Sequence, residues 1–194
     1  MRGATLWVVD PEVRWAIRPT EAADAPFLVS MLVEAANWSP DRPRRSVEET
    51  LADRQVAHYL DGWPRADDFG VIAIDELAAA IGACWARCLP TDDPGYGYVA
   101  SDVPEIGVAV IAQSRRRGVG RTLLRRVAEE GRRTGVQRLS LSVERTNPAS
   151  HLYRSEGWRT VSTAAGSDTM VLDLNKPNPS VAGVEGYEAP RWFA

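Results

Sequence analysis

Residues that bind metals or form disulfides are scarce in this sequence. Its 194 residues include two histidines, His58 and His151, and two cysteines, Cys84 and Cys88. The histidines are too few and too isolated for a metal site, so we expect no bound metal. The cysteines lie in one apolar run that predicts a strand, where their backbones would be about 13 Å apart, beyond disulfide reach. We therefore expect both cysteines to be reduced.

Long apolar runs and a large net charge are also absent. The N-terminal stretch MRGATLWVVDPEVRW lacks an apolar core of about seven residues, which argues against a signal or transit peptide, and no later run approaches membrane length. We predict a cytoplasmic protein without a membrane partner. The net charge of −3 disfavours a protein whose whole surface binds nucleic acid. Because 44% of the residues are apolar, the chain has material for one well-buried core, and we expect a single domain.

Local patterns predict alternating strands and helices. Apolar runs and alternation indicate seven strands, at residues 15–19, 69–74, 78–89, 105–111, 138–144, 158–161 and 169–174. Helical spacing and capping residues indicate four helices, one from Asp24, one from Ser46 to Gly62, one that closes at Gly135 and a short one from Asn147 to Gly157. Residues 90–104, rich in Pro, Gly and Asp, predict a long mobile loop. Residues 175–194 lack periodicity, so we interpret them as an irregular extension that docks through Trp192 and Phe193.

The stretch RRRGVGRTLL, residues 115–124, places three arginines and two glycines before an amphipathic helix. A helix N-terminus presents unpaired N–H groups and a positive dipole end, and glycines there let a phosphate approach the backbone. Two nucleotide motifs share this physics but fail here. The P-loop needs a glycine and a lysine where Arg115 and Arg121 stand, and the dinucleotide fingerprint needs a glycine at Leu123. What remains is the pattern R-x-x-G-x-G, formed by Arg115, Gly118 and Gly120.

This pattern and its flanks resemble the GNAT superfamily of acetyl-CoA-dependent N-acetyltransferases, in which Q/R-x-x-G-x-G/A binds the coenzyme pyrophosphate. EIGVAV precedes the motif, LLRRVAEEGRRTG follows it, and RLSLSVERTNPASHLYRSEGW is similar to the family's second coenzyme-contacting segment. One departure is that Gln113 and Ser114 occupy a turn where many members have proline, which we expect to reduce rigidity rather than function. The resemblance covers residues 15–174. It implies an α/β (α+β) fold in one domain, residues 1–174, with a mixed, mostly antiparallel central sheet of six to seven strands and about four flanking helices.

The resemblance also implies acetyl-CoA as the donor, coenzyme A as the product and no metal. The strand edge at residues 108–110 would bind the pantetheine arm, and residues 115–121 would bind the pyrophosphate. The implied coenzyme-binding residues are Val108, Ala109, Val110, Arg115, Arg116, Arg117, Gly118, Val119, Gly120, Arg121, Asn147 and Tyr153. Two alternatives stay open. Asn147 is equally explained as a helix cap, and arginines can form a solvated face paired with Glu129 and Glu130, which we assign only to Arg125, Arg126, Arg132 and Arg133.

Acyl transfer to an amine needs a base for the ammonium proton and an acid for the leaving thiolate. Tyr153 matches the family tyrosine that approaches the coenzyme sulfur, and its phenol suits the acid role. The alternative is a core aromatic packed beside Leu152. Glu105 is the candidate base, directly or through water, because it begins the strand that would flank the thioester. Its alternative is a solvent-facing carboxylate, since a register change of one residue reverses the face of a strand residue.

The acceptor pocket of the family is usually built from the first two helices and the loop before the central strand. Here the corresponding aromatic residues are Trp38, Tyr96, Tyr98 and Trp85. Together with Asp92, Asp93 and Asp102 they would suit a cationic amine, through carboxylate pairing and cation–π contact. The alternative is that these aromatics are ordinary core residues and that the acids are solvated.

Our leading hypothesis is an N-acetyltransferase that moves an acetyl group to a primary amine of a small molecule or peptide, by direct attack in a ternary complex. Neither cysteine has a histidine base nearby in the sequence, so an acyl-enzyme has little support. The alternative is a non-catalytic acyl-CoA-binding regulatory module. A nucleic-acid partner is disfavoured by the net acidity and by the acids within the arginine-rich helix. The resemblance leaves a homodimer open.

Overall fold

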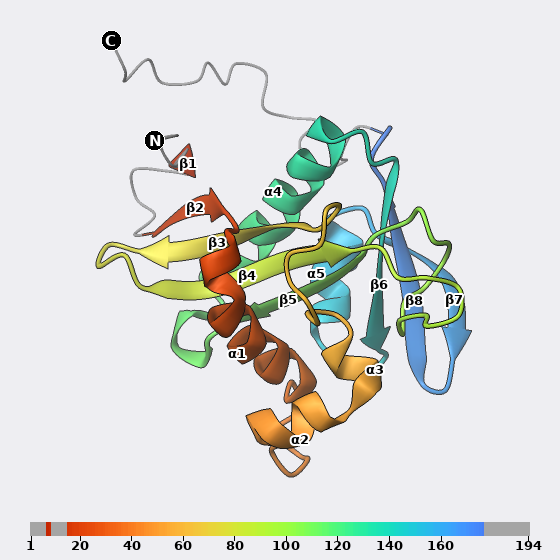
Figure 1. The fold of residues 1–194 in the computed structure, drawn as a ribbon, viewed down its shortest axis with the longest axis horizontal. Coiled ribbons are helices and arrows are strands. Elements are labelled where there is room, and N and C mark those ends of the chain that lie inside the picture. The colour runs from red at the N-terminus through yellow and green to blue at the C-terminus, as the bar shows by residue number, and fades with distance from the viewer. Residues whose placement is uncertain (1–6, 9–14, 177–194) are drawn as a thin grey trace.

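The computed structural model describes residues 7–8 and 15–176 of the chain. Within these residues one mixed sheet runs through the molecule, with strands in the order β1-β2-β3-β4-β5-β6-β8-β7 (Figure 1). The strands are β1 Trp7–Val8, β2 Trp15–Pro19, β3 Phe69–Asp75, β4 Ala80–Arg87, β5 Glu105–Val110, β6 Arg138–Glu144, β7 Arg159–Ala164 and β8 Ser167–Asp173. All neighbouring strands pair antiparallel except β5 and β6, which are parallel. The mixed, mostly antiparallel sheet expected from the sequence is confirmed.

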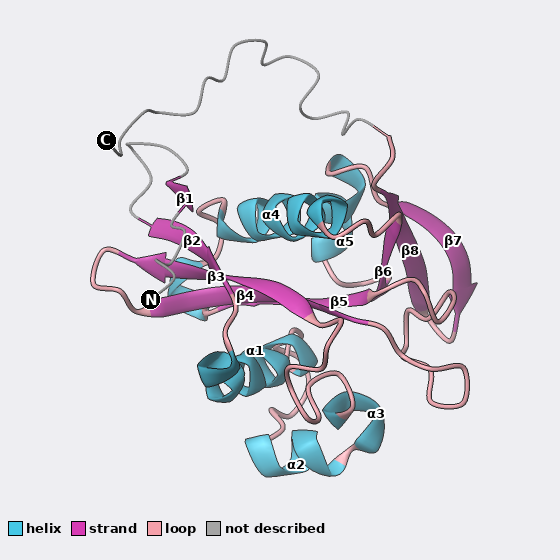
Figure 2. Ribbon diagram, turned by 45° about the horizontal axis from the view of Figure 1, so that its top comes forward, coloured by secondary structure: helices cyan, strands magenta, loops and turns pink. Residues whose placement is uncertain are grey.

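Helices cover both faces of this sheet (Figure 2). The helices are α1 Ala25–Ala36, α2 Val47–Ala52, α3 Arg54–Ala57, α4 Val119–Arg133 and α5 Ala149–Ser155. The first three lie on one face, and α4 and α5 lie on the other. Because side chains alternate along a strand, Cys84 of β4 packs in the apolar cluster under α4, while its neighbour Trp85 packs in the cluster under α1. The sheet therefore separates two apolar cores.

The helix predicted from Ser46 to Gly62 is wrong in its extent. Its capping box forms, because the Ser46 hydroxyl accepts from Glu49 N–H at 3.1 Å and the Glu49 carboxylate accepts from Ser46 N–H at 2.7 Å. The helix nevertheless ends at Ala52, since Asp53 adopts an extended conformation and its carboxylate accepts from Gln55 N–H to begin α3. A second cap inside the apolar pattern thus divides one predicted helix into two short ones.

Smaller features of the structure can also be compared with the sequence predictions. The two-residue strand β1 was not predicted, whereas residues 90–104 contain neither helix nor strand, as expected. Strand β4 ends at Arg87, so Cys88 lies just beyond it, and both cysteines are free thiols. The predicted docking residues of the tail lie outside the described residues.

The parallel strands β5 and β6 pair at a single position, Glu105 opposite Ser140. At this end the N–H of Ser140 donates to the carbonyl oxygen of Pro104 at 2.9 Å. No pairing follows further along the two strands, so the sheet is split between them toward Val110 and Glu144. Adjacent strands that do not bond to each other leave backbone donors and acceptors available to a ligand.

Candidate active site

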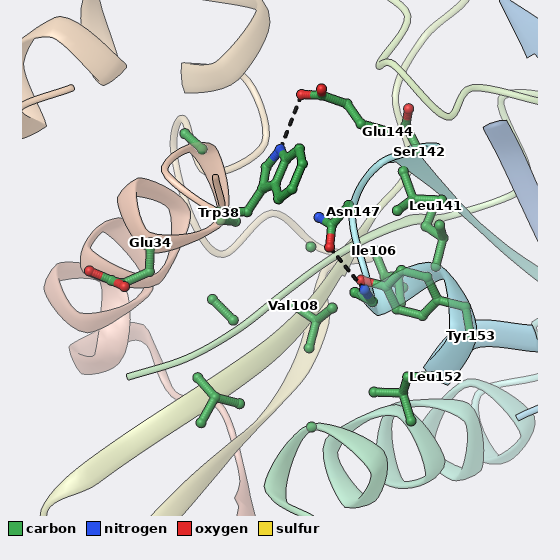
Figure 3. Close-up of a pocket in the computed structure, with 18 of the residues that line it drawn as sticks. Glu34, Trp38, Ile106, Val108, Leu141, Ser142, Glu144, Asn147, Leu152 and Tyr153 are labelled. Atoms are coloured by element: carbon green, nitrogen blue, oxygen red, sulfur yellow. Dashed lines mark hydrogen bonds between the residues drawn. The ribbon is translucent and has the colours of Figure 1, made fainter. Parts of the chain in front are cut away.

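A cavity of about 1160 Å³ opens at this split (Figure 3). Strands β5 and β6, the C-terminal half of α1, the loop before α4 and helix α5 all contribute to its lining. Figure 3 shows Val108 of β5 facing this space, with Tyr153 and, lower down, Leu152 of α5 to its right. The volume is large enough for a cofactor together with a small acceptor.

The exposed edge of β5 belongs to Ile106 and Val108. The N–H of Ile111 donates to the carbonyl oxygen of Ile81 at 3.0 Å, so Ile111 and Ile81 form a hydrogen-bonded pair that continues the β4–β5 ladder. Because bonding alternates along an antiparallel pair, the backbone groups of Ala109 turn toward β4, and those of Ile106 and Val108 turn toward the split. Of the expected strand residues, Val108 therefore presents its backbone to the cavity, whereas Ala109 does not.

The loop before α4 ends in a bare helix N-terminus. Gly118, the N-cap, has φ of 87° and ψ of −12°, in the left-handed region that favours glycine. Among the described residues no side chain caps this helix, and its first backbone bond is from Thr122 N–H to the Gly118 carbonyl, at 3.1 Å. The N–H groups of Val119, Gly120 and Arg121 precede that bond and have no carbonyl within the helix. Such an end binds anions.

Arginine side chains surround this helix end, but they differ in their partners. Arg116 and Arg117 are exposed and make no hydrogen bond or ion pair with any described residue; Arg116 lines the cavity and Arg117 does not. Arg115 instead bridges two elements, with Nε donating to the Val110 carbonyl and Nη2 to Glu34, both at 2.8 Å. Arg116 is thus the arginine that is free to meet an anion in the cavity.

The remaining arginines are held by acids of their own or other helices. Arg121 lines the cavity, but its Nε lies 2.9 Å from Glu156. Arg125 was expected to pair with an acid within α4, and this expectation is wrong. Its Nε lies 2.7 Å from Glu156, because the folded chain brings the end of α5 against α4. The expected pairs within α4 do form, with a spacing of three residues, as Arg126–Glu129 and Arg133–Glu130. Arg132 donates to the Leu174 carbonyl instead.

Tyr153 is a buried aromatic that also lines the cavity. Its ring packs against Trp158 with 6.2 Å between centroids, and only 8% of the residue is exposed. No described residue makes a hydrogen bond to its hydroxyl. Burial, with a smaller effect of Cys84, raises the pKa of Tyr153, so the phenol remains protonated at neutral pH. Asn147, one residue before the N-cap Pro148 of α5, accepts from Ala149 N–H at 2.9 Å and also lines the cavity (Figure 3).

Glu105 is almost fully buried, with 3% of the residue exposed, so the solvent-facing alternative is wrong. Its Oε1 accepts from the Tyr59 hydroxyl and from Gly97 N–H, each at 2.6 Å. Its Oε2 has no partner among the described residues. Burial raises the pKa of Glu105 to about 7, although the hydrogen bonds from Tyr59 and Gly97 act to lower it. A carboxylate with this pKa titrates at neutral pH.

The expected acceptor residues are only partly brought together. Trp38, Tyr96 and Trp85 line the cavity, and Trp85 is fully buried. Tyr98 is not among the lining residues, because its hydroxyl turns to Thr91, at 2.8 Å. The expected acids are also elsewhere. Asp92 and Asp102 do not line the cavity, and Asp93 lies 3.4 Å from His58 and 3.7 Å from Arg54.

A polar cluster closes the cavity on the side of Trp38. The indole N–H of Trp38 donates to Glu144 at 3.1 Å, as Figure 3 shows. The guanidinium of Arg42 lies 5.4 Å from the Trp38 ring centroid and forms two hydrogen bonds to the same carboxylate. These bonds hold the pKa of Glu144 below its usual value. The loop after α1 is thereby tied to the end of β6 across the split.

Sequence comparison agrees with this geometry. The profile of the acetyltransferase (GNAT) family matches residues 32–158. The chain belongs to the GNAT acetyltransferase family. This membership supports acetyl transfer as the general activity of the protein. No curated protein sequence matches the chain significantly.

Solved GNAT structures share the fold at low identity. The GNAT domain of S. lividans PAT has a TM-score of 0.63 and 19% identity, covering 88% of this chain and 96% of that one. PaiA N-acetyltransferase from Thermoplasma acidophilum, solved with coenzyme A, has a TM-score of 0.61 and 15% identity, covering 83% and 99%. YncA from Salmonella typhimurium, solved with acetyl-CoA, has a TM-score of 0.59 and 19% identity, covering 84% and 95%. At these identities the likeness shows the fold.

Sequence reasoning missed several lining residues of this GNAT chain: Tyr59, Arg42, Arg45 and Glu144. Tyr59 lies 46 positions from Glu105, and Trp38 lies 106 positions from Glu144, so no local pattern connects them. Within the described residues there is no group of three or more His, Cys, Asp or Glu side chains that could hold a metal ion. The same part of the chain contains no helix long and apolar enough to cross a membrane.

Proposed function

We propose that this protein transfers the acetyl group of acetyl-CoA to a primary amine of a small molecule or peptide, by direct attack in a ternary complex. One observation carries the proposal: a single cavity joins a bare helix N-terminus with free arginine charge to a buried carboxylate that titrates near neutral pH. The first suits the phosphates of a coenzyme and the second suits a general base.

The residues present fit coenzyme A. The free backbone groups of Ile106 and Val108 match the amide-bearing pantetheine arm, and the N–H groups at the start of α4 match the pyrophosphate. Arg116 supplies charge to the phosphates, while Arg115, held by Glu34 and the Val110 carbonyl, fixes the loop against β5. When bound, the coenzyme supplies the thioester that carries the acetyl group.

The chain's own groups supply the proton transfers. Glu105 accepts the proton that the ammonium group must lose, directly or through water, so that the amine nitrogen can attack the thioester carbon. The carbon–sulfur bond then breaks as the Tyr153 hydroxyl donates its proton to the leaving thiolate, and the second proton that the nitrogen must lose returns to the Tyr153 phenolate. Burial raises the pKa of the Cys84 thiol, which therefore remains protonated and is a poor nucleophile, in agreement with direct transfer.

Isothermal titration of acetyl-CoA and free-thiol release with a panel of amines test the proposal, on wild type and on Tyr153→Phe. No described residue bonds to the Tyr153 hydroxyl, so the variant should fold and bind acetyl-CoA as wild type does, while thiol release falls about 100-fold. Tyr98→Phe removes a hydroxyl outside the cavity and serves as the matched control.

The outcomes separate the hypotheses. Binding together with amine-dependent thiol release supports the transferase and begins to identify the acceptor. Binding without release from any amine would instead favour a non-catalytic acyl-CoA-binding module. Absence of coenzyme binding by the wild type would overturn both.

A further inference from the structure

Tyr59 makes the only side-chain hydrogen bond to Glu105 among the described residues. It follows α3 in the chain, and its hydroxyl reaches across to Oε1 of Glu105 at 2.6 Å. The same hydroxyl oxygen accepts from Tyr96 N–H at 2.8 Å, in the loop that covers the strand entry. With 7% of the residue exposed, Tyr59 packs in the apolar cluster under α1 and also lines the cavity. It joins the helical layer, the loop and the candidate base.

The two donors on Oε1 of Glu105 favour the ionised form of the carboxylate and fix its orientation. Gly97 N–H and the Tyr59 hydroxyl both point at this one oxygen, whereas Oε2 lies under the backbone of Gly95 and has no partner. Without these donors a carboxylate as buried as Glu105 would lose its hydration without gaining any hydrogen bond in exchange, so its neutral form would dominate. Donation to the ionised form opposes that effect and also fixes the side-chain rotamer.

We propose that Tyr59 is a positioning residue for the proposed reaction, whose hydroxyl holds the Glu105 carboxylate ionised and oriented for accepting the proton of the amine. The inference rests on the proposed function, because it acts through the base assigned there. Burial and the neighbouring Glu105 charge raise the pKa of Tyr59, so its hydroxyl stays protonated and remains a donor throughout the working pH range.

The pH profile of thiol release tests this role in Tyr59→Phe, which keeps the packing of the ring. Because the lost hydrogen bond acts to lower the pKa of Glu105, the acidic limb of kcat/KM should move upward from about 7. A shift of one unit makes the rate at pH 7 fall about fivefold, because the ionised fraction of Glu105 drops from about one half to about one eleventh, with recovery at higher pH, and leaves KM for acetyl-CoA unchanged. Tyr98→Phe is the control for loss of a hydroxyl from the same region.

A double-mutant cycle with Glu105→Gln gives a second measurement that does not depend on the pH profile. If Tyr59 acts through Glu105, then Tyr59→Phe should produce no further loss of kcat in the Glu105→Gln background. An equal loss in both backgrounds would overturn the positioning role and show that Tyr59 acts on structure alone. An acidic limb of the single variant that coincides with that of wild type would overturn it as well.

A ¹³C titration of the Glu105 carboxyl separates failure of this inference from failure of the proposed function. The resonance is assigned by its loss in Glu105→Gln and requires no turnover. A shift in Tyr59→Phe without a change in the acidic limb would show that Glu105 is not the base, which overturns the positioning role while acetyl transfer stands. If wild type releases no thiol with any amine, the proposed function fails. An unchanged titration of Glu105 in Tyr59→Phe would independently overturn the effect of the Tyr59 hydroxyl on the Glu105 carboxyl.

Discussion

The cavity has two walls that differ in what they present. We define the coenzyme wall as the exposed edge of β5 with residues 115–121, and the acceptor wall as Trp38, Arg42, Tyr59, Tyr96, Glu105 and Glu144. The coenzyme wall offers backbone N–H and C=O groups, with charge added by Arg116. The acceptor wall offers side chains, and all of them except that of Tyr96 are held by a partner from a distant segment.

This difference bears on how each wall tolerates change. Backbone groups persist whatever the side chain is, so the coenzyme wall depends mainly on the conformation of a short loop, with charge from Arg116 as the main side-chain contribution. The acceptor wall depends on the identity of each side chain, because one hydroxyl or one carboxylate carries each contact. We therefore expect substitutions in the acceptor wall to change turnover most, and substitutions in the coenzyme wall to change affinity and stability.

The largest effect is expected for Glu105→Gln. Removal of the base should lower kcat at least about 100-fold, measured by thiol release at pH 8, without weakening acetyl-CoA binding. In wild type the base works only when ionised, so kcat/KM should fall as the pH drops below about 7. Activity of the variant within a few-fold of wild type would remove Glu105 from the mechanism.

Stability provides the control for the same variant. Because the pKa of Glu105 in the fold, about 7, lies above its unfolded value, its contribution favours the fold at low pH and is lost as the pH rises through 7. The ionised carboxylate then costs about 3 kcal/mol at pH 8. Glu105→Gln should therefore unfold at a higher temperature than wild type at pH 8, and this advantage should disappear toward pH 4.5.

An intermediate effect is expected for the double variant Arg116→Ala/Arg117→Ala. These exposed arginines have no described partner, so their loss costs the fold little, but it removes the Arg116 guanidinium from the cavity and a second positive charge, that of Arg117, from the same loop. We expect the Kd for acetyl-CoA to rise about tenfold or more, and its dependence on salt to weaken. Isothermal titration at two salt concentrations measures both quantities.

The charge-matched control is Arg133→Ala/Arg138→Ala, which removes two exposed arginines at the far end of α4 and the start of β6. Equal weakening of coenzyme binding in both double variants would show that only the net charge matters. The loop before α4 would then lose its assigned role.

The smallest effect is expected for Gly118→Ala. An alanine at φ of 87° costs about 1–2 kcal/mol, so the midpoint of denaturant unfolding should decrease. Gly120→Ala is the matched control, because its added Cβ would lie 3.6 Å from Leu152, an ordinary contact distance. If both alanines lower stability equally, the left-handed conformation is not what Gly118 provides.

The conformation of the loop before α4 was easier to predict from the sequence than the side-chain contacts around Glu105. The pattern Arg115–Gly118–Gly120 is local, and a strand before it and a helix after it determine what the loop presents. The ion-pair partner of each arginine was less predictable, because Arg115 pairs with Glu34 of α1 and Arg125 pairs with Glu156 at the end of α5. Contacts of this kind depend on packing, which local spacing does not encode.

Tyr59 and Glu105 show the same limit in the acceptor wall. A strand-initial glutamate was a reasonable base, but its burial depends on the register of β5 and on the loop that covers it. No local sequence pattern pointed to a role for Tyr59, because its partner Glu105 lies 46 positions away. The helix predicted to contain Tyr59 also ends seven residues earlier, at Ala52. Only the folded chain brings the two together.

By itself, the sequence determined the order of strands β2 to β8 and of the longer helices, the loop chemistry at the start of α4 and the family to which the chain belongs. These features depend on interactions between residues near one another in the chain. The tertiary structure decided which oxygen of Glu105 is partnered, which arginine is free and which aromatics reach the cavity. Those outcomes depend on desolvation and on contacts across the sheet, and both exist only once β5 and β6 lie side by side, paired at Glu105 and Ser140 and separated beyond them.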